Sequence, residues 1–291
     1  MYDSGIKQQW GRHILTYYYT GASMKGIANV GLSDVQAVYS GPEGDLWELV
    51  MGQQIHIGGF QSSMDLAEKA GIGPGTAGVD LCCCNGAGMR FLVRFRNVAR
   101  MTGVDATQTV VERGRTRCKA EGLADKITFT LADACNTGLP GAKADFVWGE
   151  DAWCYVADKK QLIAEAVRLV KPGGTIAFTD WVEGRSPLIN GESERFLNFM
   201  KFPNILDTEG YASLLAKNGC DVLVAEDTGR FAPCVDLYLN MLNMQLTYDA
   251  LRIIGFDIPM MEALGAEMNF TRDLAHAGKI VQGLFVARKR V

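Results

Sequence analysis

The stretch Gly78-Val-Asp-Leu-Cys-Cys-Cys-Asn-Gly-Ala-Gly88 decides the fold of this chain of 291 residues. Residues 76–83 form a short apolar run that ends in a turn containing glycine, which is typical of a strand buried in a parallel sheet. Residues 87–98 then have the apolar spacing of a helix. A strand that turns directly into a helix begins a βαβ unit, so we expect a second parallel strand beyond the helix.

The middle of the chain repeats this alternation of strand and helix. Further strands are predicted at 100–104, 126–131, 144–148 and 175–179, and further helices at 109–121 and 159–170. Lys171-Pro-Gly-Gly174 stops the last of these helices. Three of the first four strands end in an acidic residue or just before one. This rhythm requires a parallel sheet that is covered by helices on both faces.

The C-terminal part follows a different pattern. A helix at 207–217 and a strand at 221–226 precede a helical insertion at about 232–277, and a last strand follows at 280–287. Two late strands added to a parallel sheet fit an antiparallel hairpin at one edge. The insertion between them is long enough to reach back over the carboxyl edge of the sheet.

The N-terminal part is predicted to be a helical prelude over residues 1–45. Apolar and aromatic residues recur there every three or four positions, namely Trp10, His13, Ile14, Tyr17 and Tyr18. Residues 21–26 read as a loop, and Asp34 as the start of a short helix. A face packed into the core and a mobile lid over a site fit this pattern equally well. We expect residues 1–58 to form a helical lid on a main domain of residues 59–291.

Composition narrows the class of protein. The net charge is −4 and no basic block is present, which argues against a nucleic-acid partner. No apolar run reaches the roughly 18 residues that a membrane span requires, and no export signal is visible, so a soluble cytoplasmic protein is expected. The eight cysteines form no CxxC pair and are expected to be reduced thiols. Neighbouring side chains of Cys82, Cys83 and Cys84 would face opposite sides of a strand, so we expect packing residues and no metal site.

Acidic residues at the strand ends point to a bound nucleoside. Ligands of such sheets lie outside the carboxyl ends of the strands. Asp105 lies 19 residues after Gly86, which is about the distance at which an acid after the second strand accepts from ribose hydroxyls. Asp133 can accept from an adenine amine, while Gly86 and Gly88 let the backbone approach the ligand. The alternatives are that Asp105 caps a helix and that Asp133 is a solvated loop acid.

The combined motifs resemble the class I S-adenosylmethionine-dependent methyltransferases. The matching pieces are Asp80-Leu-x-x-x-Asn-Gly-x-Gly, Gly103-Val-Asp-Ala106, Ala132-Asp-Ala134 and Lys171-Pro-Gly-Gly174, and the likeness covers residues 60–181. Residues 150–159, 39–52 and 56–59 resemble segments of the sarcosine/dimethylglycine and phosphoethanolamine N-methyltransferases. The long insertion resembles the sarcosine/dimethylglycine enzymes specifically. The resemblance implies a doubly wound, mostly parallel seven-stranded sheet with an antiparallel last strand. It also implies S-adenosylmethionine as donor and S-adenosylhomocysteine as product.

The same resemblance implies roles for individual residues. Tyr39 would close over the methyl donor, and Asp151 would face the substrate. The cofactor-binding residues would be Tyr39, Gly59, Asp80, Cys82, Gly86, Gly88, Asp105, Ala106, Asp133, Ala134 and Gly149.

Two departures from the family pattern affect the site. Cys82 and Cys84 replace the first two glycines of the cofactor loop, so either the loop shifts or the thiols line the pocket. Tyr155 replaces the catalytic histidine of the phosphoethanolamine enzymes, which puts a phosphobase substrate in doubt. His56 is the one histidine that we expect near the site, and a packing role fits it equally well.

Methyl transfer to an amine requires a neutral nucleophile in line with the donor. Tyr39, Asp151 and Tyr155 are the candidates to take or relay a proton. Trp148, Trp153 and Trp181 follow the fourth and fifth strands, where they would hold an ammonium by cation–π contact or pack in the core. We expect a small-molecule methyltransferase that acts on an amine nitrogen, as a possible homo-oligomer.

Several alternatives stay open. The acceptor atom could be oxygen, sulfur or carbon, with arsenic the least supported. The chain could also be a non-catalytic cofactor-binding protein. A nicotinamide dehydrogenase is disfavoured by the Lys-Pro-Gly-Gly turn and the terminal hairpin.

Overall fold

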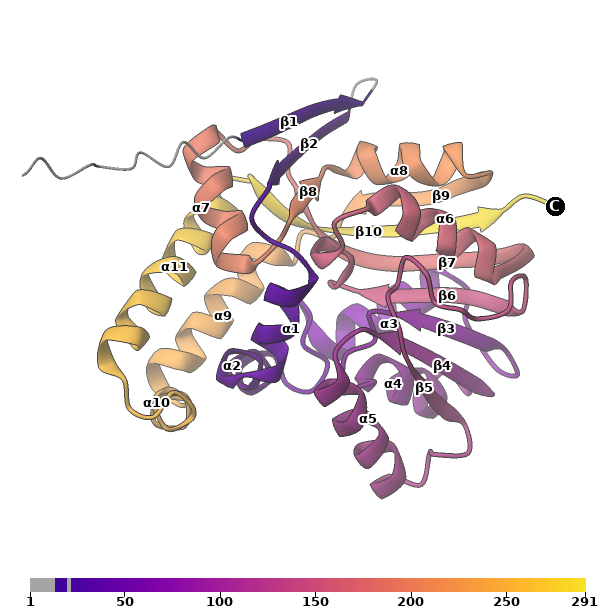
Figure 1. Ribbon diagram of the computed structural model, residues 1–291, viewed down its shortest axis with the longest axis horizontal. Helices are drawn as coiled ribbons and strands as arrows, with labels where there is room; N and C mark the ends of the chain where they lie inside the picture. The colour runs from indigo at the N-terminus through magenta and orange to yellow at the C-terminus, as the bar shows by residue number, and fades with distance from the viewer. Residues whose placement is uncertain (1–13, 20–21) are drawn as a thin grey trace, which may run out of the picture.

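A seven-stranded sheet forms the centre of the protein (Figure 1). The computed structural model describes residues 14–19 and 22–291. The strand order is β5-β4-β3-β6-β7-β10-β9. The bounds are β3 Ala77–Leu81, β4 Arg100–Asp105, β5 Ile127–Leu131, β6 Ala144–Glu150, β7 Val170–Glu183, β9 Cys220–Asp227 and β10 Ile280–Lys289. Strands β3 to β7 are parallel and β10 is antiparallel to both of its neighbours. The predicted doubly wound sheet with an antiparallel last strand is therefore confirmed.

Helices cover both faces of this sheet (Figure 1). On one face, α6 (Lys159–Leu169) and α8 (Thr208–Lys217) pack their apolar side chains on the sheet. On the other face lie α3 (Gly59–Lys69), α4 (Ala87–Phe95) and α5 (Gln108–Ala120). No helix in the described part of the chain has the length and apolar character that a membrane crossing needs.

The helical insertion lies where the sequence placed it, between β9 and β10. It consists of α9 (Phe231–Met244), α10 (Thr247–Ile253) and α11 (Ile258–His276), which extend away from the sheet (Figure 1). Together with α7 (Asn190–Met200) it builds a separate apolar cluster around Trp181 and Phe231. Helix α7 and the short strand β8 (Asn204–Leu206) were not predicted.

The helical prediction for the N-terminal residues is wrong for the segments 14–19 and 22–27. Residues Ile14–Tyr19 form β1 and Ala22–Ile27 form β2, so the loop expected at 21–26 is largely a strand. The run Ile-Leu-Thr-Tyr-Tyr-Tyr is rich in β-branched and aromatic residues, which favour strands, and β2 gains a further partner in β8. Trp10 and His13 lie outside the described residues. Helices α1 (Leu32–Ser40), with Asp34 in its first turn, and α2 (Pro42–Met51) do form.

The Lys171-Pro-Gly-Gly174 stretch is also not a simple turn. It lies inside β7, where the pairing with β6 shifts from Ala144↔Val170 to Phe146↔Thr175. The stretch therefore contains extra residues without a partner on β6, which form a bulge-like irregularity near the start of β7.

A buried aspartate and a buried lysine fix the segment that follows β6. Asp180 on β7 is fully buried, and its carboxylate accepts from the backbone N–H of Cys154 at 3.0 Å and from the Tyr211 hydroxyl. Lys159, which is 3% exposed, donates to the carbonyl of Cys154 at 3.2 Å. These contacts hold the short 3-10 helix η1 (Trp153–Tyr155) against the sheet. Burial raises the pKa of Asp180 to about 6, although the charge of Lys159 opposes this shift.

This shift predicts a pH dependence of stability. A folded-state pKa above the unfolded value of 3.8 means that protonated Asp180 favours the fold. The contribution is complete below about pH 4 and is lost as the pH rises through 6, on the order of 2–3 kcal/mol in all. Between pH 4 and 6 the Tm of the wild type should therefore fall relative to that of Asp180→Asn. Calorimetric melting at several pH values checks this, with Asp125→Asn on an exposed loop as control. Parallel pH profiles for wild type and Asp180→Asn would contradict the assignment.

Candidate active site

A cavity of about 330 Å³ lies at the carboxyl ends of β3, β4, β5 and β6. The residues that follow these strands form its floor, and α1 and residues 53–55 form its cover. This volume lies within the range of small-molecule sites. Its position is the crevice where ligands of doubly wound sheets bind.

The turn after β3 keeps a glycine-like backbone although it contains cysteines. Cys82 and Cys84 have φ values of +61° and +47°, in the left-handed region that favours glycine. That conformation costs a residue with a side chain roughly 1–2 kcal/mol. Both cysteines line the cavity, so of the two expected outcomes it is the thiols that face the pocket. Burial raises the pKa of Cys84 to about 12 and that of Cys82 well above its usual value, so both thiols are neutral at ordinary pH.

Asp105 joins this turn to the end of β4. One carboxylate oxygen accepts from the Cys84 N–H at 2.9 Å, and the other accepts from the Thr107 N–H at 2.8 Å. The N-cap of α5 is Thr107, so Asp105 does not cap that helix. Burial raises the pKa of Asp105, while these backbone N–H groups lower it. Asp105 and the turn after β3 therefore meet at one point of the cavity wall.

The residues after β5 extend the same wall. Asp133 is exposed at the rim and accepts from the Cys135 N–H at 2.8 Å, whereas Ala134 is buried. Both line the cavity, as does Ala106, whose carbonyl accepts from the Gln36 side chain at 2.7 Å. Gln36 belongs to α1, so this bond ties the cover to the floor.

The four glycines that were predicted to bind the cofactor differ in whether they line the cavity. Gly88 lines the cavity, and a Cβ there would lie 2.6 Å from Oε2 of Glu150. Gly86 is the N-cap of α4, where a Cβ would lie 2.5 Å from the Phe129 ring. Gly149 faces the Trp153 indole, and Gly59 begins α3. Of these four, only Gly88 is a lining residue.

A pair of tyrosines closes one side of the cavity. The Tyr39 hydroxyl on α1 donates to the Tyr155 hydroxyl on η1 at 3.0 Å, and the rings meet edge to face at 5.5 Å. Burial raises the pKa of each hydroxyl well above its usual value. Both groups are therefore neutral hydrogen-bonding partners at ordinary pH.

Asp151 lines the cavity from the end of β6 and is held from behind. Its Oδ2 accepts from the Ile57 N–H at 2.7 Å and from the Gln282 side chain at 2.9 Å. Its φ of +49° is left-handed, a conformation that aspartate tolerates better than most residues. Burial raises the pKa of this carboxyl, and the neighbouring His56 opposes the shift.

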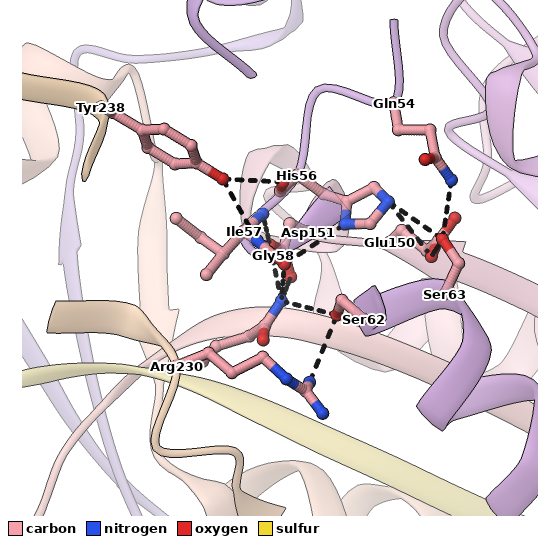
Figure 2. A network of polar contacts seen from close by, with 11 residues as sticks. Gln54, His56, Ile57, Gly58, Ser62, Ser63, Glu150, Asp151, Arg230 and Tyr238 are labelled. Carbon is pink, nitrogen blue, oxygen red and sulfur yellow. Dashed lines mark hydrogen bonds and ion pairs between the residues drawn. The ribbon is translucent and has the colours of Figure 1, made fainter. Parts of the chain in front are cut away.

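A polar network lies behind the cavity wall (Figure 2). His56 is 1% exposed and does not line the cavity; its Nε2 lies 3.3 Å from Oε1 of Glu150. Ser63 donates to the same oxygen at 2.6 Å and accepts from Gln54 at 2.8 Å. His56 therefore supports a residue of the wall and is not itself in the cavity.

Glu150, Ser63 and Gln282 were not identified from the sequence as site residues. The sequence does contain a signal for Gln282, because it is a polar residue within an otherwise apolar last strand, where the structure buries it. Glu150 is an acidic residue at a strand end, the same pattern that singled out Asp105 and Asp133, whereas Ser63 carries no comparable local pattern.

The three tryptophans do not come together at the cavity. Trp148 is 1% exposed beneath α4, and Trp153 stacks on Phe178 at 4.0 Å with its indole N–H bonded to the Leu81 carbonyl. Trp181 packs in the cluster under the helical insertion. None is a lining residue, so the placement corresponds to the core alternative and not to an aromatic cage.

The cavity is chemically suited to a cationic nucleoside ligand. Six lining residues are acidic, namely Asp80, Asp105, Asp133, Glu150, Asp151 and Asp158, and no Lys, Arg or His is among the described lining residues. Asn85 lines the cavity, is 2% exposed, and has an Oδ1 without a partner in the described structure. Gly88 leaves a space beneath Glu150 that any side chain would fill. These features fit a ligand that carries both polar hydrogens and positive charge.

Comparison with known proteins identifies the class. Residues 79–178 match the family model described as a methyltransferase domain. Methyltransferase GfsG of Streptomyces halstedii is 26% identical over 69% of this chain and 76% of its own length. Phosphoethanolamine N-methyltransferase 1 of Arabidopsis thaliana is 25% identical over 69% of this chain, but this region is 39% of that longer protein. Other relatives are named as carbon or oxygen methyltransferases.

Solved structures share the fold. A protein from Galdieria sulphuraria described as a sarcosine dimethylglycine methyltransferase has a TM-score of 0.68 at 20% identity, covering 79% of this chain and 86% of that one. Phosphoethanolamine N-methyltransferase 2 of Haemonchus contortus, solved with S-adenosylhomocysteine, has a TM-score of 0.78 at 18% identity, covering 88% of this chain and 59% of that one. Residues 79–178 therefore form a methyltransferase domain, and the chain shares the fold of these solved methyltransferases.

The position of Asp105 yields a binding prediction. Asp105→Asn keeps the side-chain shape but replaces the charged carboxylate, which would accept hydrogen bonds from the ribose hydroxyls, with a neutral amide. A hydrogen bond to a charged group contributes about 1.5–3 kcal/mol, so binding of S-adenosylhomocysteine should weaken at least tenfold. Isothermal titration calorimetry measures this change. Asp105→Ala also removes the acceptor for the Cys84 and Thr107 N–H groups, so it should lower the Tm as well. An unchanged affinity in Asp105→Asn would remove the ribose assignment.

Proposed function

We propose that the enzyme transfers the methyl group to an amine nitrogen of a small molecule. The observation that supports this most is the large number of acidic residues in the cavity wall. Asp151 is one of them, and the hydrogen-bonded pair Tyr39 and Tyr155 lines the same cavity. Carboxylates and neutral hydroxyls attract and orient an alkylammonium through its N–H groups. The relatives carry names for nitrogen, oxygen and carbon acceptors, so the choice of nitrogen depends on this chemistry.

Each residue has a distinct proposed role. When bound, S-adenosylmethionine supplies an activated methyl group on a sulfonium, so the protein has to position the acceptor and exclude water. Asp151 is the proposed base, because its raised pKa makes it a stronger proton acceptor than an ordinary carboxylate. Tyr39 and Tyr155 are too weakly acidic to ionise, so they position the nitrogen through hydrogen bonds. Ile57 and Gln282 hold Asp151 in place from behind.

Residues 1–58 are proposed to act as the cover of this site, as a unit distinct from residues 59–291. In addition to the contacts of Gln36 and Tyr39, Glu48 of α2 forms ion pairs with Arg117 at 2.5 Å and Arg113 at 3.3 Å on α5. A cytoplasmic location and a homo-oligomeric state stay predictions.

A panel of acceptors tests the proposal. Purified protein with S-adenosylmethionine should form S-adenosylhomocysteine and an N-methylated product with sarcosine, dimethylglycine or simple alkylamines, as seen by mass spectrometry. Asp151→Asn should reduce kcat about 100-fold if it removes a general base. Tyr155→Phe should raise KM, with exposed Tyr248→Phe as the matched control. Turnover confined to hydroxyl, thiol or carbon acceptors would reject the amine assignment, and no turnover with any acceptor would favour a non-catalytic role.

A further inference from the structure

Gln282 is a polar side chain in the apolar strand β10, and it contacts the proposed base Asp151. Its Nε2 donates to Oδ1 and Oδ2 of Asp151 at 3.1 and 2.9 Å and to the Ile57 carbonyl at 3.1 Å. The side chain is fully buried. An amide has two N–H donors and one acceptor oxygen, so its orientation decides whether Asp151 faces donors or a further acceptor.

Thr228 fixes the orientation of this amide from the other side. Its hydroxyl donates to Oε1 of Gln282 at 3.0 Å and accepts from the Arg230 N–H at 3.2 Å. Its backbone N–H also donates to the Gln282 carbonyl at 2.9 Å. Because the Arg230 N–H occupies the hydroxyl oxygen, the hydroxyl proton is directed to Oε1. Hydrogen bonds therefore run in one direction from the Arg230 backbone to the Asp151 carboxylate.

The helical insertion is attached to this chain of hydrogen bonds at two points. Arg230 is the N-cap of α9, and Tyr238 lies within the same helix. The Tyr238 hydroxyl accepts from the Gly58 N–H at 3.2 Å, next to the Ile57 N–H that donates to Asp151 at 2.7 Å (Figure 2). No residue of α9, α10 or α11, all of which the structure describes, lines the cavity. The insertion therefore reaches Asp151 from behind the cavity wall.

We propose that Gln282 and Thr228 are positioning residues for Asp151, and that the helical insertion acts on methyl transfer through them. The inference rests on the proposed function, because it takes Asp151 as the group that accepts the proton of the acceptor. Such a base has to stay ionised and has to keep a lone pair on the cavity side. N–H donors that approach from behind stabilise the charged form and leave the lone pairs on the cavity side free.

The electrostatic surroundings of Asp151 show why these bonds matter. Burial raises the pKa of this carboxyl, while the charge of His56, the Ile57 N–H and the Gln282 amide oppose the shift in that order. The other titratable groups that face it are Glu150 before it on β6, Cys154 on η1, Asp180 on β7, and Cys234 and Tyr238 on α9. Acidic neighbours disfavour the ionised form, so the N–H donors are needed to keep Asp151 a base near neutral pH.

Gln282→Met tests the amide at nearly constant volume. Loss of the N–H donors destabilises the ionised carboxylate, so the pKa of Asp151 should rise by about one unit or more. An NMR titration of the aspartate carboxyl carbons measures this shift, and the Asp151 signal is the one that Asp151→Asn loses. The acidic limb of the pH profile of kcat should move to higher pH by the same amount. The affinity for S-adenosylhomocysteine should change less than twofold.

Thr228→Val tests the step farther from the cavity. It removes the hydroxyl but keeps the shape of the side chain, so the pKa of Asp151 should rise by a smaller amount, about half a unit. This variant also serves if Gln282→Met does not fold, as judged by its melting curve. Thr116→Val is the matched control and should leave the pKa unchanged, because this exposed hydroxyl donates to the Glu112 carbonyl of its own helix.

The carboxyl signal and the enzyme assay separate this inference from the choice of acceptor. An Asp151 pKa that is equal in the wild type, Gln282→Met and Thr228→Val would overturn the inference, even if amines are methylated. A raised pKa without a matching shift in the kcat profile would overturn it as well, because the network would then not act on methyl transfer. Both shifts together with turnover confined to a hydroxyl or thiol acceptor would support the inference and contradict the amine proposal.

Discussion

The hydrogen bond from the Cys84 N–H to the Asp105 carboxylate is the contact on which the site depends. It joins the turn after β3 to the end of β4, the two segments between which a nucleoside has to bind. The Cys83 N–H bonds to the Val104 carbonyl at 3.0 Å and reinforces the same junction. Because Asp105 uses one lone pair on each oxygen for the backbone, it has others left for a ligand. One residue thereby shapes the loop and faces the cavity.

This junction explains how the loop tolerates Cys82 and Cys84. The left-handed conformation is unfavourable for both cysteines, and it persists because the surrounding contacts determine the path of the chain. Such strain is found where a backbone must present its N–H groups in a set geometry. The thiols add apolar, neutral surface beside an otherwise acidic wall. The backbone geometry of a glycine loop is thus kept while the chemistry of its surface changes.

The sequence predicted those parts of the fold that local patterns encode. The alternation from β3 to β7 and the insertion before β10 follow from apolar periodicity, and Asp105 and Asp133 follow from their positions after strands. The N-terminal hairpin was misread, because Tyr17 and Tyr18 satisfy a helical spacing although the pairing of β1 with β2, and of β2 with β8, decides the outcome. The tryptophans were expected near the site because of their positions around strand ends. Trp148 and Trp181 lie within β6 and β7, where alternate side chains enter the core, and Trp153 on η1 stacks on Phe178. Contacts such as Gln282 to Asp151 join residues 131 positions apart, and no local pattern reports them.

Electrostatics links the stability of the cavity to its function. Burial raises the pKa of Asp80, Asp105 and Asp151, so the protein folds around carboxylates that would be more stable in water or beside a cation. S-adenosylmethionine carries two positive charges, on the sulfonium and the ammonium, whereas S-adenosylhomocysteine carries only the second. The acid-rich wall therefore favours the donor over the product by its charge alone. Carboxylates that are unfavourable in the empty site thus give it selectivity for the donor over the product.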